Sequence, residues 1–143
     1  MAITMHLNIV SAEEEIYSNP AEMVIVPGSA GELGILPQHA QLLSSLKPGE
    51  VIITKPGGEQ QSIFISGGIV EVQPHVVTVL SDTAIREDDL DKEKAEQAKQ
   101  HAEEILNSSE GLDDHDLVKA QAELLQAIEQ LKLIDKLRNK RSH

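Results

Sequence analysis

The chain has 143 residues, with 24 acidic and 12 basic side chains and a formal charge of -12. Nucleic acids and anionic lipids both attract Lys and Arg, so this charge argues against nucleic-acid binding and against direct adsorption to a membrane. No apolar run approaches the roughly 20 residues of a membrane span, so we expect no direct membrane insertion. The N-terminus lacks a signal-peptide pattern and no Cys is present, which together predict a soluble cytoplasmic protein.

The first half of the chain has the pattern of short strands. Met5, Leu7 and Ile9 alternate with polar residues, as in a strand with one buried face. Further short apolar runs follow at Met23–Pro27, Val51–Thr54, Ser62–Ser66, Ile69–Gln73 and Val76–Leu80. Pro56-Gly57-Gly58 and Pro74-His75 lie between such runs and predict two hairpins. Without helical patterns between the runs, we expect an antiparallel β-sandwich over residues 1–86 and no parallel sheet.

The segment GELGILPQHAQLL, from Gly31 to Leu43, stands out within this half. Its Gly and Pro residues break any helix, and its pattern is too irregular to predict a strand. It nevertheless carries a run of large apolar residues beside Glu32 and His39: Leu33, Ile35, Leu36, Leu42 and Leu43. Exposed apolar side chains without catalytic groups indicate a protein partner. Filling of the sandwich core is the alternative for each of them.

From residue 87 to 143 the composition changes to Ala, Glu, Lys and Gln. Asp88, Asp89 and Asp91 favour a helix N-terminus there, and the sequence NSSEG ends the helix at Asn107–Gly111. One face of this helix carries Ala95, Ala98, Ala102 and Ile105. A second helix begins near Asp113 or Asp114, with a heptad seam formed by Leu117, Ala120, Leu124, Ala127, Leu131 and Ile134. The fold class is therefore α+β, a sandwich followed by an antiparallel two-helix hairpin.

The sequence leaves two interpretations of how firmly this hairpin packs. Alanine buries little surface, and the apolar stripe of the second helix is wider than its partner requires, with Val118, Leu125, Ile128 and Leu137 flanking the seam. One interpretation is a hairpin that docks weakly and can detach, and the other is a stable helical subdomain. The end of the chain is basic, with Lys132, Lys136, Arg138, Lys140 and Arg141. This charge suits a helix C-terminus or an acidic protein partner.

Sequence signatures of catalysis are missing. GSAGELG, from Gly28 to Gly34, is followed by no Gly-Lys-Ser/Thr, so it is not a phosphate-binding loop. The six His residues form no metal-binding pair, and Asp113–Asp116 is better explained as a helix cap than as a cation site. No nucleophile has the local signature of an adjacent base. We therefore expect no enzyme activity, no catalytic residues, no metal and no cofactor.

Three stretches, in their order along the chain, resemble the epsilon subunit of bacterial F-type ATP synthase, and most closely its proteobacterial form. They are LNIVSAEEEIYS, GSAGELGILPQHAQLL and SGGIVEVQPHVVTVLSDTAIR, followed by a charged helical tail. The resemblance implies a ten-stranded β-sandwich and a two-helix hairpin. It implies a rotor subunit of the central stalk that couples ion flow through the c-ring to ATP synthesis. It also implies a peripheral position on the cytoplasmic face of the inner membrane.

The same resemblance implies the partners and the contact residues. The sandwich would bind the gamma subunit and the c-ring, the latter through Gly31, Glu32, Leu33, Gly34, His39, Leu42 and Leu43. The hairpin would open, insert its second helix between gamma and the alpha and beta subunits, and inhibit ATP hydrolysis. The expected contacts of this regulatory tail are Ser108, Lys132, Lys136, Arg138, Lys140 and Arg141.

A rival interpretation is an ATP-sensing binding module. Some family members bind ATP through a motif similar to I/L-D-x-x-R-A, and this chain has LDKEKA at Leu90–Ala95. Asp91 matches the motif, but Lys94 replaces its Arg and cannot form the two-pronged contact that Arg makes with phosphate. We therefore expect ATP binding at Asp91 and Lys94 to be weak at best. Whether the coupled ion is a proton or sodium does not follow from the sequence.

Overall fold

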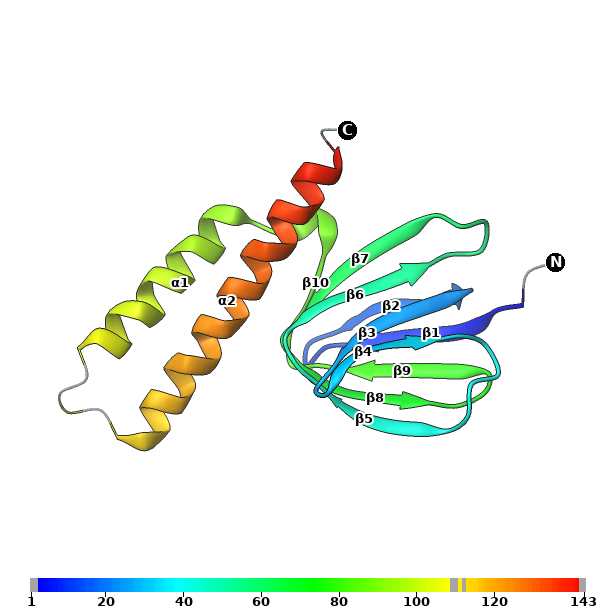
Figure 1. The fold of residues 1–143 in the computed structure, drawn as a ribbon, viewed down its shortest axis with the longest axis horizontal. Coiled ribbons are helices and arrows are strands. Elements are labelled where there is room, and N and C mark those ends of the chain that lie inside the picture. Colours follow the sequence, from blue (N-terminus) through cyan, green and yellow to red (C-terminus); the bar gives the residue numbers. More distant parts are fainter. Residues whose placement is uncertain (1–2, 109–110, 112, 142–143) are drawn as a thin grey trace. The chain divides into compact units, whose positions relative to one another are not determined.

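The computed structural model describes residues 3–108, 111 and 113–141, and of residue 141 the backbone alone. The chain forms two compact units, Met1–Asp89 and Leu90–His143, and each is described here by itself. The first unit consists of β-strands and the second of two helices (Figure 1). This arrangement confirms the predicted α+β class.

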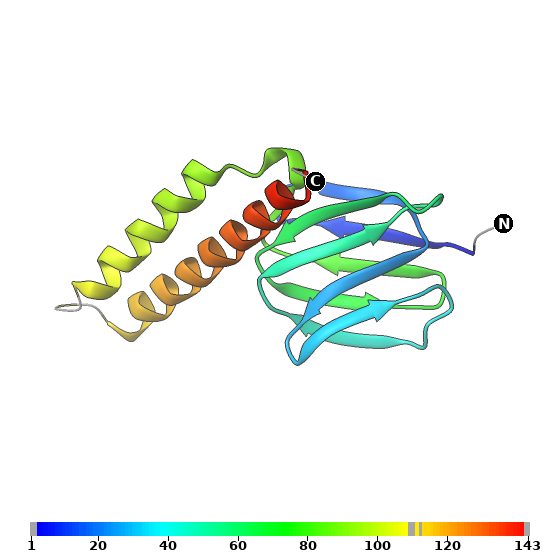
Figure 2. The same ribbon diagram turned by 45° about the horizontal axis from the view of Figure 1, so that its top comes forward.

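The described part of the first unit holds ten strands and a short 3-10 helix. These elements are β1 (Met5–Val10), β2 (Glu15–Ala21), β3 (Met23–Gly28), β4 (Gly31–Ile35), β5 (Leu42–Leu46), β6 (Gly49–Thr54), β7 (Gln60–Ile65), β8 (Gly68–Val72), β9 (Val76–Leu80), β10 (Ala84–Arg86) and η1 (Glu87–Asp89). The strands pair in the order β10-β7-β6-β3-β5-β8-β9-β1-β2, with β4 added to β3. The sheet curls into two facing layers, joined where Gly28 of β3 meets Leu46 of β5 (Figure 2).

Both hairpins expected from turn residues are present. Strand β6 pairs with β7 across the Pro56-Gly57-Gly58 turn, where both glycines have positive φ. Strand β8 pairs with β9 across Pro74-His75, where the backbone N–H of Gln73 donates to the carbonyl oxygen of Val76 at 2.9 Å. These strands form where apolar runs are interrupted by residues that suit tight turns.

One strand pair differs from the expected antiparallel pattern. Strands β1 and β9 run parallel, with His6 opposite Val76 and Val10 opposite Leu80. Two parallel strands that follow each other directly in the chain need a crossover connection, usually a helix, and the described part of this half of the chain contains no such helix. β1 and β9 are joined instead through the seven strands between them, which carry the chain around the sandwich. The predicted antiparallel sandwich therefore contains one parallel pair among its described strands, β1 with β9.

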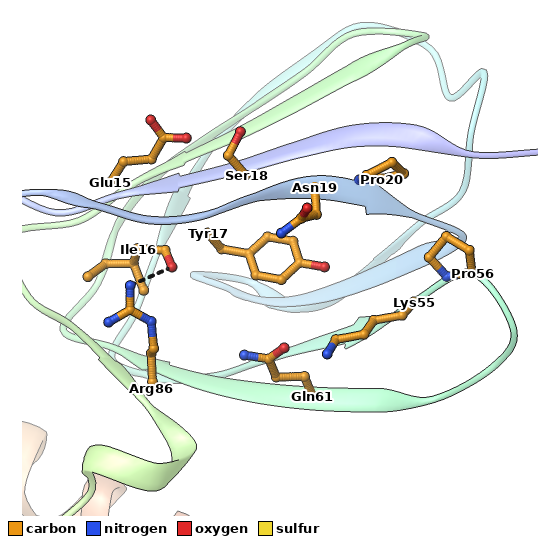
Figure 3. Close-up of a pocket in the computed structure, with 10 residues that line it drawn as sticks. All are labelled: Glu15, Ile16, Tyr17, Ser18, Asn19, Pro20, Lys55, Pro56, Gln61 and Arg86. Atoms are coloured by element: carbon orange, nitrogen blue, oxygen red, sulfur yellow. Dashed lines mark hydrogen bonds between the residues drawn. The ribbon is translucent and has the colours of Figure 1, made fainter.

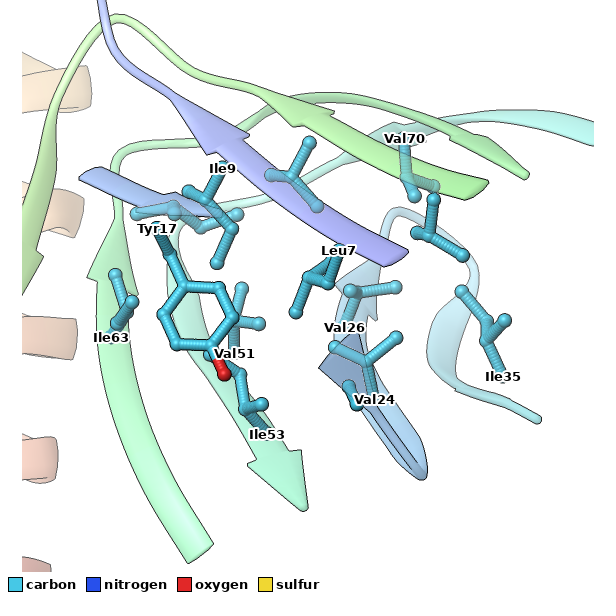
Figure 4. Close-up of a cluster of buried hydrophobic side chains, with 14 of the residues drawn as sticks. Leu7, Ile9, Tyr17, Val24, Val26, Ile35, Val51, Ile53, Ile63 and Val70 are labelled. Carbon is cyan, nitrogen blue, oxygen red and sulfur yellow. The ribbon is translucent and has the colours of Figure 1, made fainter. Parts of the chain in front are cut away.

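The core lies between the two layers and is built from aliphatic side chains (Figure 4). Met5, Leu7 and Ile9 of β1 are all buried, as their alternation predicted. They pack in a cluster with Val24, Val26, Ile35, Val51, Ile53, Ile63, Ile65, Val70, Val72, Val77 and Val79. Burying each such side chain stabilises the fold by about 1.5–3 kcal/mol relative to exposure. The side chain of Arg86 links β10 and β2, the first and last strands in the pairing order. Its Nη2 donates to the carbonyl oxygen of Ile16 at 3.0 Å.

The second unit contains α1 (Lys92–Asn107) and α2 (Asp114–Arg141). Asp91 caps α1, with its Oδ1 accepting from the backbone N–H of Lys94 at 3.2 Å. Asp113 caps α2 by accepting from the N–H of Asp116 at 2.8 Å, which confirms the capping interpretation of Asp113–Asp116. The first helix ends at Asn107 as predicted, while Ser109 and Glu110 of the expected break lie outside the described residues.

The buried residues in the described part of the helical unit are four alanines together with Leu133 and Leu137 of α2. Ala95 and Ala102 of α1 and Ala120 and Ala127 of α2 are buried, each pair at seven-residue spacing. The two helices also meet through an ion pair between Lys92 and Asp135 at 3.9 Å. The remaining residues of the predicted α2 seam are half-buried: Leu117, Leu124, Leu131 and Ile134. Ala98, which was predicted on the same face of α1 as Ala95 and Ala102, is exposed.

No helix in the described ranges is both long enough and apolar enough to cross a membrane.

Candidate functional site

The segment from Gly31 to Leu43 is not a loop throughout. Gly31–Ile35 forms β4, which pairs with β3 so that Glu32 lies opposite Pro27 and Leu33 opposite Val26. The expectation that this stretch is too irregular for a strand was therefore wrong. Its missing alternation is tolerated because the ladder with β3 holds the backbone, and because β4 is an edge strand paired on one side.

Two glycines shape the turn between β3 and β4. Gly31 has a φ of +137°, a conformation that other residues rarely adopt. A Cβ on Gly28 would lie 2.5 Å from the carbonyl oxygen of Gly31. The turn is therefore tight, and it presents the exposed Glu32 beside it on the surface of the sandwich.

The structure places Glu32 and His39, both predicted as c-ring contacts, on different elements. Glu32 lies beside the β3–β4 turn, whereas His39 lies in the segment between the other end of β4 and the start of β5. Near His39, the N–H of Gln38 donates to the carbonyl oxygen of Pro74 at 2.7 Å, which ties this loop to the β8–β9 turn. A single flat partner surface at one end would therefore meet either Glu32 or His39.

The apolar residues of the segment divide between core and surface. Leu33 and Leu42 are half-buried and pack against the core, and Ile35 is buried within it. Leu36 and Leu43 instead expose 58% and 69% of their surface. Gly31 and Gly34 are also exposed. Of the expected contact residues, Leu43 thus has the greatest apolar surface available for a partner.

Leu43 belongs to a larger surface that sequence reasoning missed. On the outer side of the layer β5-β8-β9, four large side chains are exposed: Leu43, Ile69, Val76 and Leu80. We call these four residues the outer apolar face. Ile69 lies directly opposite Leu80 in the β8–β9 ladder, so their side chains share one side of the sheet. The sequence did contain a signal for this face. Ile69 and Leu80 occupy outward-facing positions of their strands, where a solvent-exposed sheet face would carry polar residues.

A hollow of about 430 Å³ borders this face beside Val10, Ile69 and Leu80. Its floor includes Gly67 and Gly68, both with positive φ. A Cβ on Gly68 would lie only 1.9 Å from the carbonyl oxygen of Leu80, so no other residue fits there without a shift of the backbone. Gly67 and Gly68 therefore allow β8 to lie close to the end of β9.

Next to the outer apolar face lies a hydrogen-bonded group of polar side chains. His6 Nε2 lies 2.9 Å from Ser18 Oγ and 3.0 Å from Asn8 Oδ1, and Ser18 Oγ donates to Asn8 Oδ1 at 2.9 Å. The exposed Glu71 also lies on this face, directly opposite Leu43. An apolar area with a polar, hydrogen-bonded border has the composition of a protein–protein interface.

In the helical unit, the two residues predicted to bind a nucleotide have different surroundings. The Asp91 carboxylate accepts the capping hydrogen bond described above, and Lys94 is exposed on α1. Asp91 is therefore explained by the helix alone. Among the residues that the structure describes, no group of three metal-ligating side chains occurs.

The expected tail contacts are distributed along the hairpin. Ser108 ends α1, with its Oγ donating to the carbonyl oxygen of Ile105 at 3.2 Å. Lys132 pairs with Glu129 at 3.3 Å. Lys136, Arg138 and Lys140 are exposed on the last turns of α2, and the side chain of Arg141 lies outside the described residues. The structure thus places the basic residues together on α2, but Ser108 at the far end of the hairpin.

Comparison with known families defines the class of protein. The model described as ATP synthase, Delta/Epsilon chain, beta-sandwich domain matches residues 4–87. The model described as ATP synthase, Delta/Epsilon chain, long alpha-helix domain matches residues 88–135. The chain therefore belongs to the delta/epsilon chain family of ATP synthase.

Curated relatives narrow the class to the epsilon chain. The ATP synthase epsilon chain of Thioalkalivibrio sulfidiphilus is 55% identical over 139 residues, covering 96% of this chain and 97% of that one. The epsilon chain of Janthinobacterium sp. is 56% identical over 142 residues, covering 99% and 100%. Epsilon chains are non-catalytic stalk subunits, as the lack of catalytic motifs led us to expect.

A solved structure shares the fold. A chain in the Euglena gracilis mitochondrial ATP synthase structure, which contains OSCP, F1 and the c-ring, has a TM-score of 0.74. It is 23% identical in sequence and is matched over 88% of this chain and 78% of its own length.

Proposed function

We propose that this chain is a rotor subunit that links the c-ring to the catalytic part of ATP synthase and restrains ATP hydrolysis through its helical hairpin. The outer apolar face carries this proposal, because Leu43, Ile69 and Leu80 expose apolar surface on a rigid sheet. Apolar patches of this kind mark sites of protein contact. A gamma subunit is the proposed occupant.

The c-ring contact is proposed at the turn between β3 and β4. Glu32 is exposed beside the turn, and Gly31 and Gly34 leave the backbone accessible around it. Such a protruding polar tip suits the polar loops of a membrane ring better than the outer apolar face does. This contact would hold the subunit at the cytoplasmic face of the membrane as a peripheral protein.

The restraining role is proposed for the helices. Buried alanines hold the helices to each other, while Val118 and Leu125 expose 64% and 46% of their surface on α2 at seven-residue spacing. An exposed stripe of this kind can pack against a second partner when the hairpin opens. The basic residues Lys136, Arg138 and Lys140 then suit acidic surface on the alpha and beta subunits.

ATP hydrolysis by the catalytic complex tests the proposal. The complex would be measured without this chain, with the full chain, and with a chain ending at Asp88. We expect inhibition by the full chain and loss of inhibition, with binding retained, for the shortened chain. Inhibition that persists without the helices would contradict the role of the hairpin.

Binding of the gamma subunit provides the second readout. Leu80→Asp should weaken binding at least tenfold, because it buries a charge in an apolar interface. Gln60→Asp is the matched control, since it adds the same charge at an exposed position of β7 in the other layer. Equal binding by both variants would place gamma elsewhere.

A further inference from the structure

The strand order leaves an open seam in the sandwich. Strand β2 pairs only with β1, and β10 covers only Ile63–Ile65 of β7. Residues 60–62 of β7 therefore face β2 without a strand between them. The seam contains a pocket of about 890 Å³ (Figure 3), and we call it the seam pocket. Its volume lies within the range of small-molecule sites, roughly 300–1,000 Å³.

A β-bulge gives the seam pocket its apolar wall. The register between β1 and β2 shifts after Ile9, which pairs with Tyr17, whereas Val10 pairs with Glu15. Ile16 is therefore unpaired in the ladder, and both Ile16 and Tyr17 are buried. A regular strand would turn one of the two outward, so the bulge directs an additional apolar side chain inward.

Polar groups converge on the same space. The hydroxyl of Tyr17, the ammonium of Lys55 and the amide of Gln61 point into the seam pocket (Figure 3). Within the described part of the chain, none of these three side-chain groups has a hydrogen bond or ion pair to another residue. Each can donate a hydrogen bond. The pocket thus offers hydrogen-bond donors beside an apolar wall, with Lys55 as a cationic donor and the guanidinium of Arg86 as a second positive charge in the lining.

The surrounding charges define the ligand further. Glu15 and Arg86 also line the seam pocket, and the Arg86 guanidinium donates to the carbonyl oxygen of Ile16 at its edge (Figure 3). Glu59, Glu87 and Asp88 line a smaller hollow that also includes Lys55. These carboxylates disfavour a ligand of high negative charge, such as a polyphosphate, but they are compatible with a ligand that carries a single negative charge.

A peptide strand is a poorer occupant than a small molecule. Adding a strand requires a row of free N–H and C=O groups along the sheet edge. β2 contains Pro20, which has no N–H, and proline is a common device against pairing at sheet edges.

We propose that the seam pocket binds a small amphipathic carboxylate. The apolar body lies against Tyr17 and Pro56, and the carboxylate accepts from Lys55 and Gln61. No covalent step is involved. The site is separate from the outer apolar face on β5, β8 and β9, because none of the four residues of that face lines the seam pocket.

Backbone amide NMR of the full chain tests this proposal, with naphthoate as the anionic probe and naphthamide as its neutral counterpart. We expect saturable shifts at Tyr17 and Gln61 with a Kd below about 1 mM, which is reasonable for a ligand of this size. Lys55→Gln should weaken naphthoate binding about tenfold or more, since a charged hydrogen bond is lost. Lys47→Gln is the matched control, because Lys47 is exposed in the β5–β6 turn outside the pocket.

Several results would overturn the proposal. Equal affinity for naphthamide would show that the carboxylate is not recognised. An unchanged Kd in Lys55→Gln, with the spectrum of a folded protein, would remove Lys55 from the site. Shifts confined to Leu43, Ile69 and Leu80 would show that the probe binds the outer apolar face instead. Absence of saturation up to about 10 mM would leave no specific site.

Discussion

The two units of this protein reach a folded state in different ways. In the sandwich, large aliphatic side chains such as Leu7, Ile53 and Ile63 are fully buried between two layers. In the described part of the helical unit, four of the buried apolar residues are alanines, Ala95, Ala102, Ala120 and Ala127, and the others are Leu133 and Leu137. Because stabilisation follows the apolar area removed from water, each of these alanines contributes less than a large aliphatic side chain of the sandwich. The difference suits a rigid platform joined to an element that can change its partners.

Removing a core side chain of the sandwich should give the largest effect. Leu7→Ala leaves a cavity in the layer interior, and we expect a loss of about 2–5 kcal/mol in the free energy of unfolding. Urea unfolding followed by amide exchange would report each unit separately. Leu125→Ala, at an exposed position of α2, is the control and should stay within about 0.5 kcal/mol. Equal losses would contradict the contrast between the units.

Enlarging a buried alanine tests the other side of the comparison. Ala102→Leu inserts three carbon atoms where the helices leave no space, and should destabilise the helical unit by about 1–3 kcal/mol while sparing the sandwich. Ala98→Leu makes the same change at an exposed position of α1. Circular dichroism during thermal unfolding would compare the two. If Ala102→Leu stabilised the helices, the alanine packing would be loose rather than close.

The smallest expected effect is the loss of sandwich stability when Tyr17 ionises, and it occurs only at alkaline pH. Burial raises the pKa of the Tyr17 hydroxyl above its usual value. Above pH 10 or so, Tyr17 loses its proton more easily in the unfolded chain than in the folded one, so sandwich stability falls as pH rises through the folded pKa. Tyr17 is the chain's one tyrosine and there is no Trp, so the ultraviolet absorbance of tyrosinate follows it directly.

Tyr17→Phe is the control for this titration. It should reduce the alkaline loss of sandwich stability and leave the unfolding of the helical unit unchanged, because no tyrosine lies in that unit. An absorbance midpoint at or below the ordinary tyrosine pKa would contradict the effect of burial.

Local patterns were sufficient for much of the fold. Alternation predicted the buried face of β1, and turn residues predicted the β6–β7 and β8–β9 hairpins. The capping role of Asp113 also followed from the sequence. These features depend on residues close together in the chain, so their signals are local.

Features that depend on distant residues were not predictable in this way. Strand β4 lacks alternation and exists through its ladder with β3, and β1 meets β9 across most of the domain. Glu32 and His39 are seven positions apart in sequence, yet Glu32 lies near the start of β4 and His39 beyond its other end. The outer apolar face was missed because Leu43, Ile69 and Leu80 come together only when three strands are in register.

The parallel pairing of β1 with β9 has a consequence for folding during synthesis. Strand β1 is made first but lacks its second neighbour until residue 80 has left the ribosome. Hairpins such as β3–β4 and β6–β7 need only nearby residues and can form earlier. Until β9 arrives, one edge of β1 is open to pairing with other chains, which is a route to aggregation. We therefore expect that nascent chains shorter than about 80 residues depend most on chaperones.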